Sequence, residues 1–224
     1  MKIIEVVQGT GDWFAVRAGL PTASEFSNLI TPTGKIRTGE TVETYLAKKL
    51  AERWTGGPLP TTYGGGALEQ GALRQNEGVR WYAYDRSVSI REVGFVLSDD
   101  GRIGCSPDGM FDDGTGIEAK CPALHTQVGY LLDGIVPAEY TAQVQGSMLV
   151  TGAPRWVFLS YCRNFPPLVL TVTRDEKFIG ALREALDAFL GRLDKGFARL
   201  TELNGGPPAR TPPPAYDDDG ILPL

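Results

Sequence analysis

A short turn at residues 112–116, with the sequence Asp-Asp-Gly-Thr-Gly, does most to restrict the fold of this chain. Aspartate and glycine in this arrangement favour the tight turn of a β-hairpin, which joins two antiparallel strands. One strand-like stretch begins at residues 103–106, and the other covers residues 117–121. The hairpin therefore predicts that Asp108, near the end of the first strand, lies beside Glu118 in the second.

Helical and strand-like segments are mixed along the rest of the chain. Apolar residues at helical spacing predict helices, and short alternating stretches predict strands. The expected helices cover residues 13–17, 22–30, 42–54, 67–84, 127–132, 138–150 and 175–193. The other expected strands cover residues 1–8, 91–97, 156–162 and 168–172. The pattern predicts the α/β (α+β) class, with a small mixed central sheet flanked by helices.

The domain organisation follows from composition. Residues 1–200 carry the whole pattern of helices and strands, so we expect a single domain there. Residues 201–224 are rich in proline and glycine and include three consecutive aspartates at 217–219. We therefore expect them to form a partly extended tail that cannot bury a core.

Charge and rare residues exclude several classes of protein. The net charge of −5 argues against a broad nucleic-acid-binding surface, although a local basic groove or channel remains compatible with it. The three cysteines lack CxxC spacing and His125 is the only histidine, which disfavours a disulfide framework, a zinc site and Ser-His-Asp catalysis. The chain has no run of about 18 apolar residues and no signal-peptide pattern, so we expect no membrane span and a cytoplasmic protein.

The hairpin gathers residues that suit metal-dependent chemistry. Side chains alternate along a strand, so Glu118 and Lys120 share one face while Ala119 points to the other. With Asp108 beside them, two carboxylates and one lysine meet, and the backbone carbonyl of Ala119 is a further candidate ligand. Hard oxygen ligands of this kind bind Mg²⁺ or Mn²⁺. The competing interpretation is structural: Asp108 is then a turn residue, and Glu118 and Lys120 form a solvated strand face.

The same residues resemble a known family. Residues 104–109 (Gly-Cys-Ser-Pro-Asp-Gly) and 118–122 (Glu-Ala-Lys-Cys-Pro) resemble the active site of the bacteriophage lambda exonuclease family, the YqaJ-type viral recombinases within the PD-(D/E)xK nuclease superfamily. Three further segments are similar to motifs of that family in the right order: residues 13–24, 140–148 and 174–177.

The resemblance implies a fold, an activity and partners. It implies a restriction-endonuclease-like core and a 5′→3′ exonuclease on double-stranded DNA that prefers 5′-phosphorylated ends. Such an enzyme releases mononucleotides and leaves 3′ single-stranded tails for annealing-type recombination. It implies two Mg²⁺ ions, with Mn²⁺ as a substitute, a ring-shaped homotrimer and a single-strand annealing protein as partner. It also implies a phage or prophage origin, with action in the cytoplasm of a bacterial host.

The resemblance assigns roles to individual residues. Arg17 and Ser24 would hold the 5′-terminal phosphate, Gln143 would lie against the metal site, and Leu68 would be an apolar wedge that parts the terminal base pair. The chemistry of an arginine and a hydroxyl suits a phosphate. The structural alternatives are a surface ion pair for Arg17, a helix cap for Ser24, a polar helix position for Gln143 and ordinary packing for Leu68.

One position departs from the family pattern. Gln75 stands where the family commonly has a metal-site glutamate, so it offers at most a neutral oxygen to the second ion. Glu77 lies two residues further along the same helix, about 200° around it, and cannot easily take over that direction. This glutamine and the acidic pI leave open a DNA-binding protein with a weakened site. An endonuclease of the same superfamily is a second alternative to the exonuclease.

A loop in the N-terminal part adds two candidates for DNA contact. Lys35 and Arg37 lie in a polar stretch at residues 31–40, from which they could reach a phosphate backbone. A solvated loop with no role in binding is the other interpretation.

Overall fold

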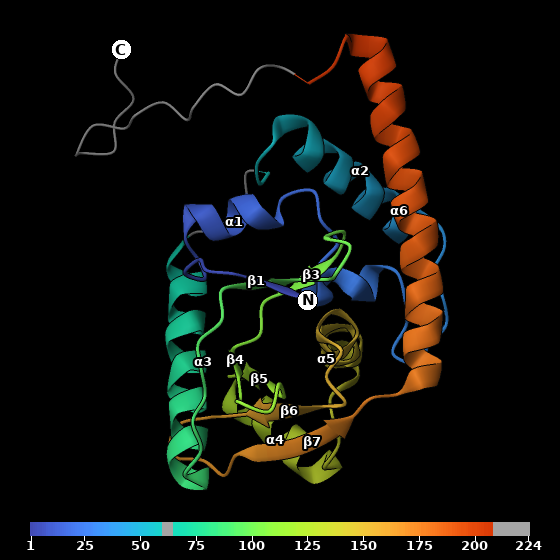
Figure 1. Cartoon of the computed structure of the whole chain (residues 1–224). Helices are drawn as coiled ribbons and strands as arrows, with labels where there is room; N and C mark the ends of the chain where they lie inside the picture. The colour runs from blue at the N-terminus through green and yellow to red at the C-terminus, as the bar shows by residue number, and fades with distance from the viewer. Residues whose placement is uncertain (60–64, 208–224) are drawn as a thin grey trace, which may run out of the picture.

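Two small sheets form the centre of the protein, and helices surround them (Figure 1). The computed structural model describes residues 1–59 and 65–207, and within residues 65–74 the backbone alone. The first sheet is antiparallel, with the order β1 (Lys2–Ile4), β2 (Phe95–Leu97) and β3 (Gly104–Cys105). The second has the order β4 (Gly109–Met110), β5 (Gly116–Lys120), β6 (Arg155–Ser160) and β7 (Leu168–Thr173). Its β5–β6 pair is parallel and its other pairs are antiparallel.

The helices follow the predicted pattern. They are α1 (Gly11–Arg17), the 3₁₀ helix η1 (Ala23–Asn28), α2 (Glu40–Thr55), α3 (Gly65–Arg86), α4 (Leu124–Asp133), α5 (Ala138–Thr151) and α6 (Glu176–Asn204). Figure 1 shows α3 and α6 on opposite sides of the molecule, with both sheets and α5 between them. The predicted mixed fold class is confirmed. Within the described residues, no helix is both long enough and apolar enough to cross a membrane.

The predicted central sheet is divided into two. β3 ends at Cys105 and β4 begins at Gly109, and Pro107 lies between them. Proline has no backbone N–H and therefore cannot continue the ladder of hydrogen bonds to β2. Asp108 consequently lies at the gap between the sheets, where its backbone N–H donates to the carbonyl of Ile117 across the hairpin (3.1 Å).

β5 has one apolar and one polar face, as the alternation of its sequence predicts. Ile117 and Ala119 are fully buried and pack with Val79 of α3 and with apolar residues of β6. Glu118 and Lys120 lie on the opposite face, where they contact residues of α5. Burial of the apolar face fixes the register of the strand, because a shift by one residue would exchange the two faces.

A close approach between α5 and η1 brings two of the elements that carry candidate site residues together. A Cβ atom at Gly146 would lie 2.4 Å from Cδ2 of Phe26, whose side chain is fully buried. Only glycine permits this separation, and it brings the Gln143 side of α5 toward the chain around Ser24. The helix predicted after Thr22 is a 3₁₀ helix, and the Thr22 hydroxyl donates to Glu25 Oε2 (3.0 Å) rather than capping it.

The last helix is longer than predicted. The sequence pattern places its end near residue 193, whereas α6 continues to Asn204 and ends at Gly205, which has a φ of +73°. No glycine–proline signal interrupts the chain before residue 205, so the helix continues beyond its last buried apolar residue. Residues 208–224 of the predicted tail lie outside the described residues, and the division of the chain at residue 200 stays a prediction.

Candidate active site

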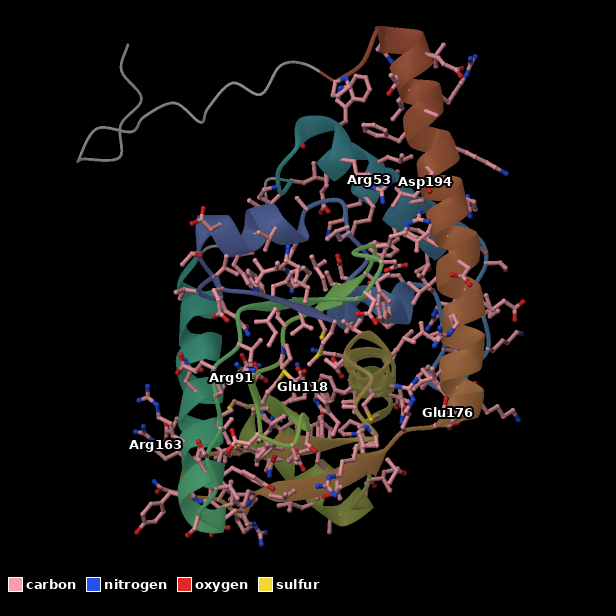
Figure 2. The ribbon with its side chains drawn as sticks, viewed as in Figure 1. Arg53, Arg91, Glu118, Arg163, Glu176 and Asp194 are labelled. Carbon is pink, nitrogen blue, oxygen red and sulfur yellow. The ribbon has the colours of Figure 1, made fainter. Side chains whose placement is uncertain are left out.

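Glu118 is the centre of the candidate site. Its side chain is almost completely buried, and Figure 2 shows it in the middle of the molecule. Lys120 Nζ and Gln143 Nε2 both donate to Glu118 Oε1, each at 2.6 Å. Glu118 Oε2 is buried and has no hydrogen-bond partner among the residues that the structure describes. A buried carboxylate oxygen without a donor is unfavourable, so this atom is available for a positive ligand.

Asp108 lies beside Glu118, as the hairpin predicts. Its Oδ2 atom accepts a hydrogen bond from the backbone N–H of Ala119 (2.7 Å). Burial raises the pKa of Asp108 from its ordinary value of 3.8 to about 8, and the nearby Glu118 carboxylate adds to this shift. Ionisation of both carboxyl groups at the same time is therefore unfavourable unless a positive ligand lies beside them.

Lys120 supplies the positive charge of the site. Its Nζ atom lies 5.0 Å from the centre of the Tyr140 ring on α5. Burial acts to lower the pKa of Lys120, but the carboxylates of Glu118 and Asp108 raise it above its ordinary value. The amine and the two acids therefore form one electrostatic unit.

A divalent cation suits the residues of this unit. Two buried carboxylates converge, and one carboxylate oxygen lacks a donor. Within the described part of the chain, no site brings together three or more His, Cys, Asp or Glu side chains. A cation held here would therefore rely on Asp108 and Glu118, and the carbonyl of Ala119, which lies between Glu118 and Lys120 in β5, is the backbone candidate.

Gln75 contacts this carbonyl directly. Its Nε2 atom donates to the carbonyl oxygen of Ala119 (2.9 Å), which has a second lone pair left for another partner. Gln75 thus joins α3 to β5 at the site without adding charge. Glu77 points elsewhere, as its position on the helix predicts, and pairs with Arg163 (2.7 Å).

Arg17 lies at the other end of the site, among hydroxyl groups. Its guanidinium donates to Ser106 Oγ (2.9 Å) and Ser24 Oγ (3.3 Å) and lies 4.1 Å from the centre of the Trp13 ring. Burial lowers the pKa of Arg17, and the charge of Glu25 is the strongest influence that opposes this. The result is a desolvated positive group surrounded by hydroxyls, a setting suited to an anion.

A single cavity of about 150 Å³ connects Arg17 with the two acids. It is lined by Gln8, Trp13, Arg17, Ala23, Ser24, Gln75, Ser106, Asp108, Glu118, Lys120, Gln143 and Ser147. Asp108 and Gln75 also border a wider cavity of about 430 Å³, whose wall includes Glu5 and Glu92. Six residues that the sequence singled out as candidates therefore line one space, together with the doubtful candidate Gln75.

Lys35 and Arg37 lie away from this cavity, and Ala119 is not among its lining residues. Lys35 is exposed in the loop between η1 and α2. Arg37 borders a separate cavity of about 230 Å³, beside Glu184 and Arg192 of α6. Leu68 lies on α3, but its side chain is outside the described residues.

Sequence reasoning missed other residues of the site. Ser106 contacts both Arg17 and Trp13 Nε1, each at 2.9 Å, although it was noted only as part of a motif. Its position two residues before Asp108 was the available signal. Tyr140, which lies beneath Lys120, gave no signal beyond its place on the predicted helix.

Comparison with known proteins identifies the family. The YqaJ-like viral recombinase domain matches residues 12–154, which include every residue of the cavity except Gln8. The chain belongs to the YqaJ-like viral recombinase family. The alkaline exonuclease LHK-Exo from Laribacter hongkongensis is similar to this YqaJ-like chain, with 25% identity and a TM-score of 0.77, over 88% of this chain and 98% of that one. LHK-Exo in complex with dAMP has 26% identity and the same TM-score and coverage.

A more distant structure shares the fold of this YqaJ-like chain. It is a phage-related exonuclease from Haemophilus somnus 129PT, with 13% identity and a TM-score of 0.60, over 81% of this chain and 96% of that one. None of the curated proteins compared with the sequence matches it. The predicted resemblance to the lambda exonuclease family is confirmed.

Replacing Asp108 by asparagine is expected to stabilise the metal-free protein. A carboxyl group whose folded pKa exceeds its unfolded pKa destabilises the fold, and the penalty grows from about pH 4 to about pH 8. The substitution should raise the free energy of unfolding by at least about 1 kcal/mol at pH 8, or roughly 2–4 °C in melting temperature. Thermal unfolding in EDTA at pH 5 and at pH 8 measures the effect, which should be larger at pH 8.

Asp187→Asn is the matched control for this prediction, since Asp187 is exposed on α6. Its effect on the melting temperature should be small at both pH values. Equal effects of the two substitutions, or a gain at Asp108 that does not grow with pH, would contradict the assignment of a strained buried carboxyl.

Proposed function

We propose that this protein is a metal-dependent 5′→3′ exonuclease on double-stranded DNA that prefers 5′-phosphorylated ends. The observation that carries the proposal is the single cavity in which Arg17 and Ser24 lie at one end and Asp108, Glu118 and Lys120 at the other. An anion-binding group at a fixed position beside a nuclease-type acid pair suits the removal of one nucleotide from a chain end. The complex of LHK-Exo with dAMP, a deoxynucleoside monophosphate, supports mononucleotides as the product.

The residues of the cavity divide the chemistry among them. Asp108, Glu118 and the carbonyl of Ala119 would hold Mg²⁺ or Mn²⁺. A divalent cation there supplies charge that polarises a phosphodiester and lowers the pKa of a water molecule. Lys120, which its carboxylate neighbours keep protonated, would orient the attacking water or stabilise negative charge on the phosphate. Gln143 fixes the rotamer of Glu118 through its 2.6 Å hydrogen bond.

The number of ions depends on Gln75. We propose two ions, as in the family, with the second held more weakly because Gln75 brings no carboxylate. Its amide nitrogen is engaged with Ala119, so the side chain would offer this ion only its neutral oxygen. A calorimetric titration with Mn²⁺ should resolve one tight and one weak event, and Gln75→Glu should strengthen the weak one; equal affinities for both ions in the native protein would refute this assignment.

The remaining DNA contacts are proposed from position alone. Leu68 would part the terminal base pair from α3, and Lys35 and Arg37 would contact the duplex from their loop. The product would carry a 3′ single-stranded tail for an annealing protein, in the cytoplasm of a bacterial host of a phage or prophage.

We also propose that the protein assembles as a homotrimer. A ring would confine DNA to a channel, where an acidic chain needs only a few basic residues facing the duplex. An apolar stripe on α4 supports contact between copies: Leu124, Val128 and Leu132 follow each other at intervals of four residues and are 57%, 41% and 82% exposed. Light scattering should give three times the 24.2 kDa of one chain, and a monomer mass would contradict the ring.

Removing the lysine should slow turnover strongly. With Mg²⁺ and a linear duplex carrying 5′ phosphates, Lys120→Ala is expected to lower kcat by about 10²–10⁴-fold, because a positioned charge-stabilising group is lost. The rate of mononucleotide release, measured by quenched-flow or gel assay, gives kcat for each variant. Lys195→Ala, an exposed lysine on α6, should leave the rate within about twofold of the native one.

The same assay separates the alternatives. Closed circular DNA should stay intact with an exonuclease, whereas cleavage of the circle would favour the endonuclease alternative. Binding of duplex DNA with equal background turnover by the native protein and Lys120→Ala would favour a DNA-binding protein with a weakened site.

Arg17 should determine the preference for a 5′ phosphate. Arg17→Ala is expected to raise KM for a 5′-phosphorylated duplex by at least about tenfold, since a charge-assisted hydrogen bond contributes on the order of 1.5–3 kcal/mol. KM for a 5′-hydroxyl duplex should change much less. A loss of activity that is equal on both duplexes would show that Arg17 does not select the end.

A further inference from the structure

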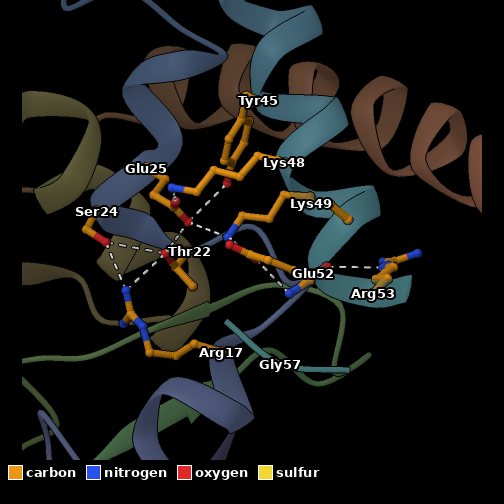
Figure 3. A network of polar contacts seen from close by, with 12 residues as sticks. Arg17, Thr22, Ser24, Glu25, Tyr45, Lys48, Lys49, Glu52, Arg53 and Gly57 are labelled. Atoms are coloured by element: carbon orange, nitrogen blue, oxygen red, sulfur yellow. Dashed lines mark hydrogen bonds and ion pairs between the residues drawn. The ribbon is translucent and has the colours of Figure 1, made fainter. Parts of the chain in front are cut away.

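A buried ion network links α2 with η1 and with the segment between α1 and η1 (Figure 3). Lys49 lies at its centre, with its Nζ atom 2.8 Å from Glu25 Oε2 and 2.9 Å from Glu52 Oε2. The Lys49 side chain is only 4% exposed and that of Glu52 8%. Charges buried to this extent are costly unless each is paired, so the three side chains depend on one another.

One end of the network fixes the backbone at Gly19. Glu52 Oε2 accepts from the N–H of Gly19 (2.9 Å), and Arg53 Nε donates to the carbonyl of Gly19 (3.1 Å). Gly19 has a φ of +74°, and a Cβ atom there would lie 2.4 Å from Cγ of Arg53. The chain that follows Arg17 is therefore attached to α2 at Gly19, where the packing is close.

The other end of the network reaches the partners of Arg17. Glu25 Oε2 accepts from the hydroxyl of Thr22 (3.0 Å), and Thr22 lies 3.3 Å from the hydroxyl of Ser24. Both hydroxyls accept from Arg17 Nη2, at 3.4 Å and 3.3 Å. A single hydroxyl group thus separates the carboxylate of Glu25 from the guanidinium of Arg17.

The distribution of charge around Arg17 is unusual for a buried arginine. Within the described residues, Arg17 donates to hydroxyl groups and forms no ion pair, although Glu25 is close. Glu25 is paired with Lys49 and, more loosely, with the half-exposed Lys48 (3.6 Å). Burial acts to raise the pKa of Glu25, but Lys49 holds it below its ordinary value, so the carboxylate stays charged and directed toward α2.

These contacts give Lys49 a specific task. We propose that Lys49 is a positioning residue that holds the carboxylate of Glu25 away from Arg17, so that the guanidinium remains free to bind a terminal phosphate. Without Lys49, Glu25 is the nearest anion to Arg17 and competes with the phosphate for it. The inference rests on the proposed function of Arg17 in end recognition, and it adds a residue that no substrate touches.

The test compares binding of short duplexes with 5′-phosphate and 5′-hydroxyl ends, measured in EDTA so that no turnover occurs. The native protein should favour the phosphorylated end by about tenfold or more, in line with a charge-assisted contact. Lys49→Met, which keeps the volume of the side chain but removes its charge, should reduce this ratio to about threefold or less. A salt titration should show the same loss of phosphate-dependent binding.

Two double variants separate charge competition from simple packing. Adding Glu25→Gln to Lys49→Met removes the competitor and should restore the ratio, because glutamine still accepts from Thr22. Adding Glu52→Gln is the control: it removes the other carboxylate that is paired with Lys49, which is more deeply buried than Glu25 (8% against 22% exposed) but faces Gly19, and it should not restore the ratio. Thermal unfolding should show a gain in stability from each second substitution, with the larger gain from Glu52→Gln because Glu52 is more deeply buried and lacks the second lysine that lies near Glu25.

If Lys49→Met folds poorly, the single variant Glu25→Gln provides the test. It should keep or increase the native ratio of affinities for the 5′-phosphate and 5′-hydroxyl duplexes. The inference is overturned if Lys49→Met keeps the native ratio, if both second substitutions or neither restore it, or if Glu25→Gln alone abolishes it. If the native protein shows no preference for the phosphorylated end, the proposed end selection by Arg17 fails together with the inference about Lys49. The other outcomes overturn only the inference about Lys49.

Discussion

The two hydrogen bonds to Glu118 Oε1 are the contacts on which the rest of the site depends. They orient the carboxylate so that Oε1 accepts from Lys120 and Gln143, while Oε2 has no donor among the described residues. The fold provides for this: β5 buries its apolar face against α3, which directs Glu118 toward α5. A buried oxygen without a donor lowers stability, and such costs are typical of sites arranged to receive a ligand.

The same principle operates at both ends of the cavity. At one end, an acid pair is held close to a single lysine and is short of positive charge; at the other, Arg17 is surrounded by hydroxyls and is short of negative charge. A neighbouring residue maintains each imbalance: Gln143 holds the carboxylate of Glu118 in place, and Lys49 holds the carboxylate of Glu25 away from Arg17. A phosphodiester near a chain end, with its terminal phosphate and a divalent cation, would complete both.

The sequence is informative where a residue's direction follows from local periodicity. The hairpin turn and the two-residue repeat of β5 are enough to predict that Asp108, Glu118 and Lys120 meet, and helical spacing correctly separates Glu77 from Gln75. Contacts that depend on tertiary packing are not predictable in this way. The pairing of Lys49 with Glu25 joins two helices that are separated by a loop, and the role of Ser106 depends on the approach of α1. Pro107 is a local signal for the split of the sheet, which the predicted single sheet did not take into account. The end of α6 at Asn204 has no apolar periodicity to mark it, because the last buried apolar residue is Leu193.

The most direct test of the central claim is the binding of Mn²⁺ to the protein without DNA, measured by calorimetry or electron paramagnetic resonance. The account predicts that the native protein binds Mn²⁺ and that Glu118→Gln weakens this binding by at least about tenfold, since the free carboxylate oxygen and its charge are lost. Glu184→Gln, at an exposed position on α6, should bind Mn²⁺ like the native protein. Equal affinity of the native protein and Glu118→Gln would contradict the claim that the buried carboxylate is a metal ligand.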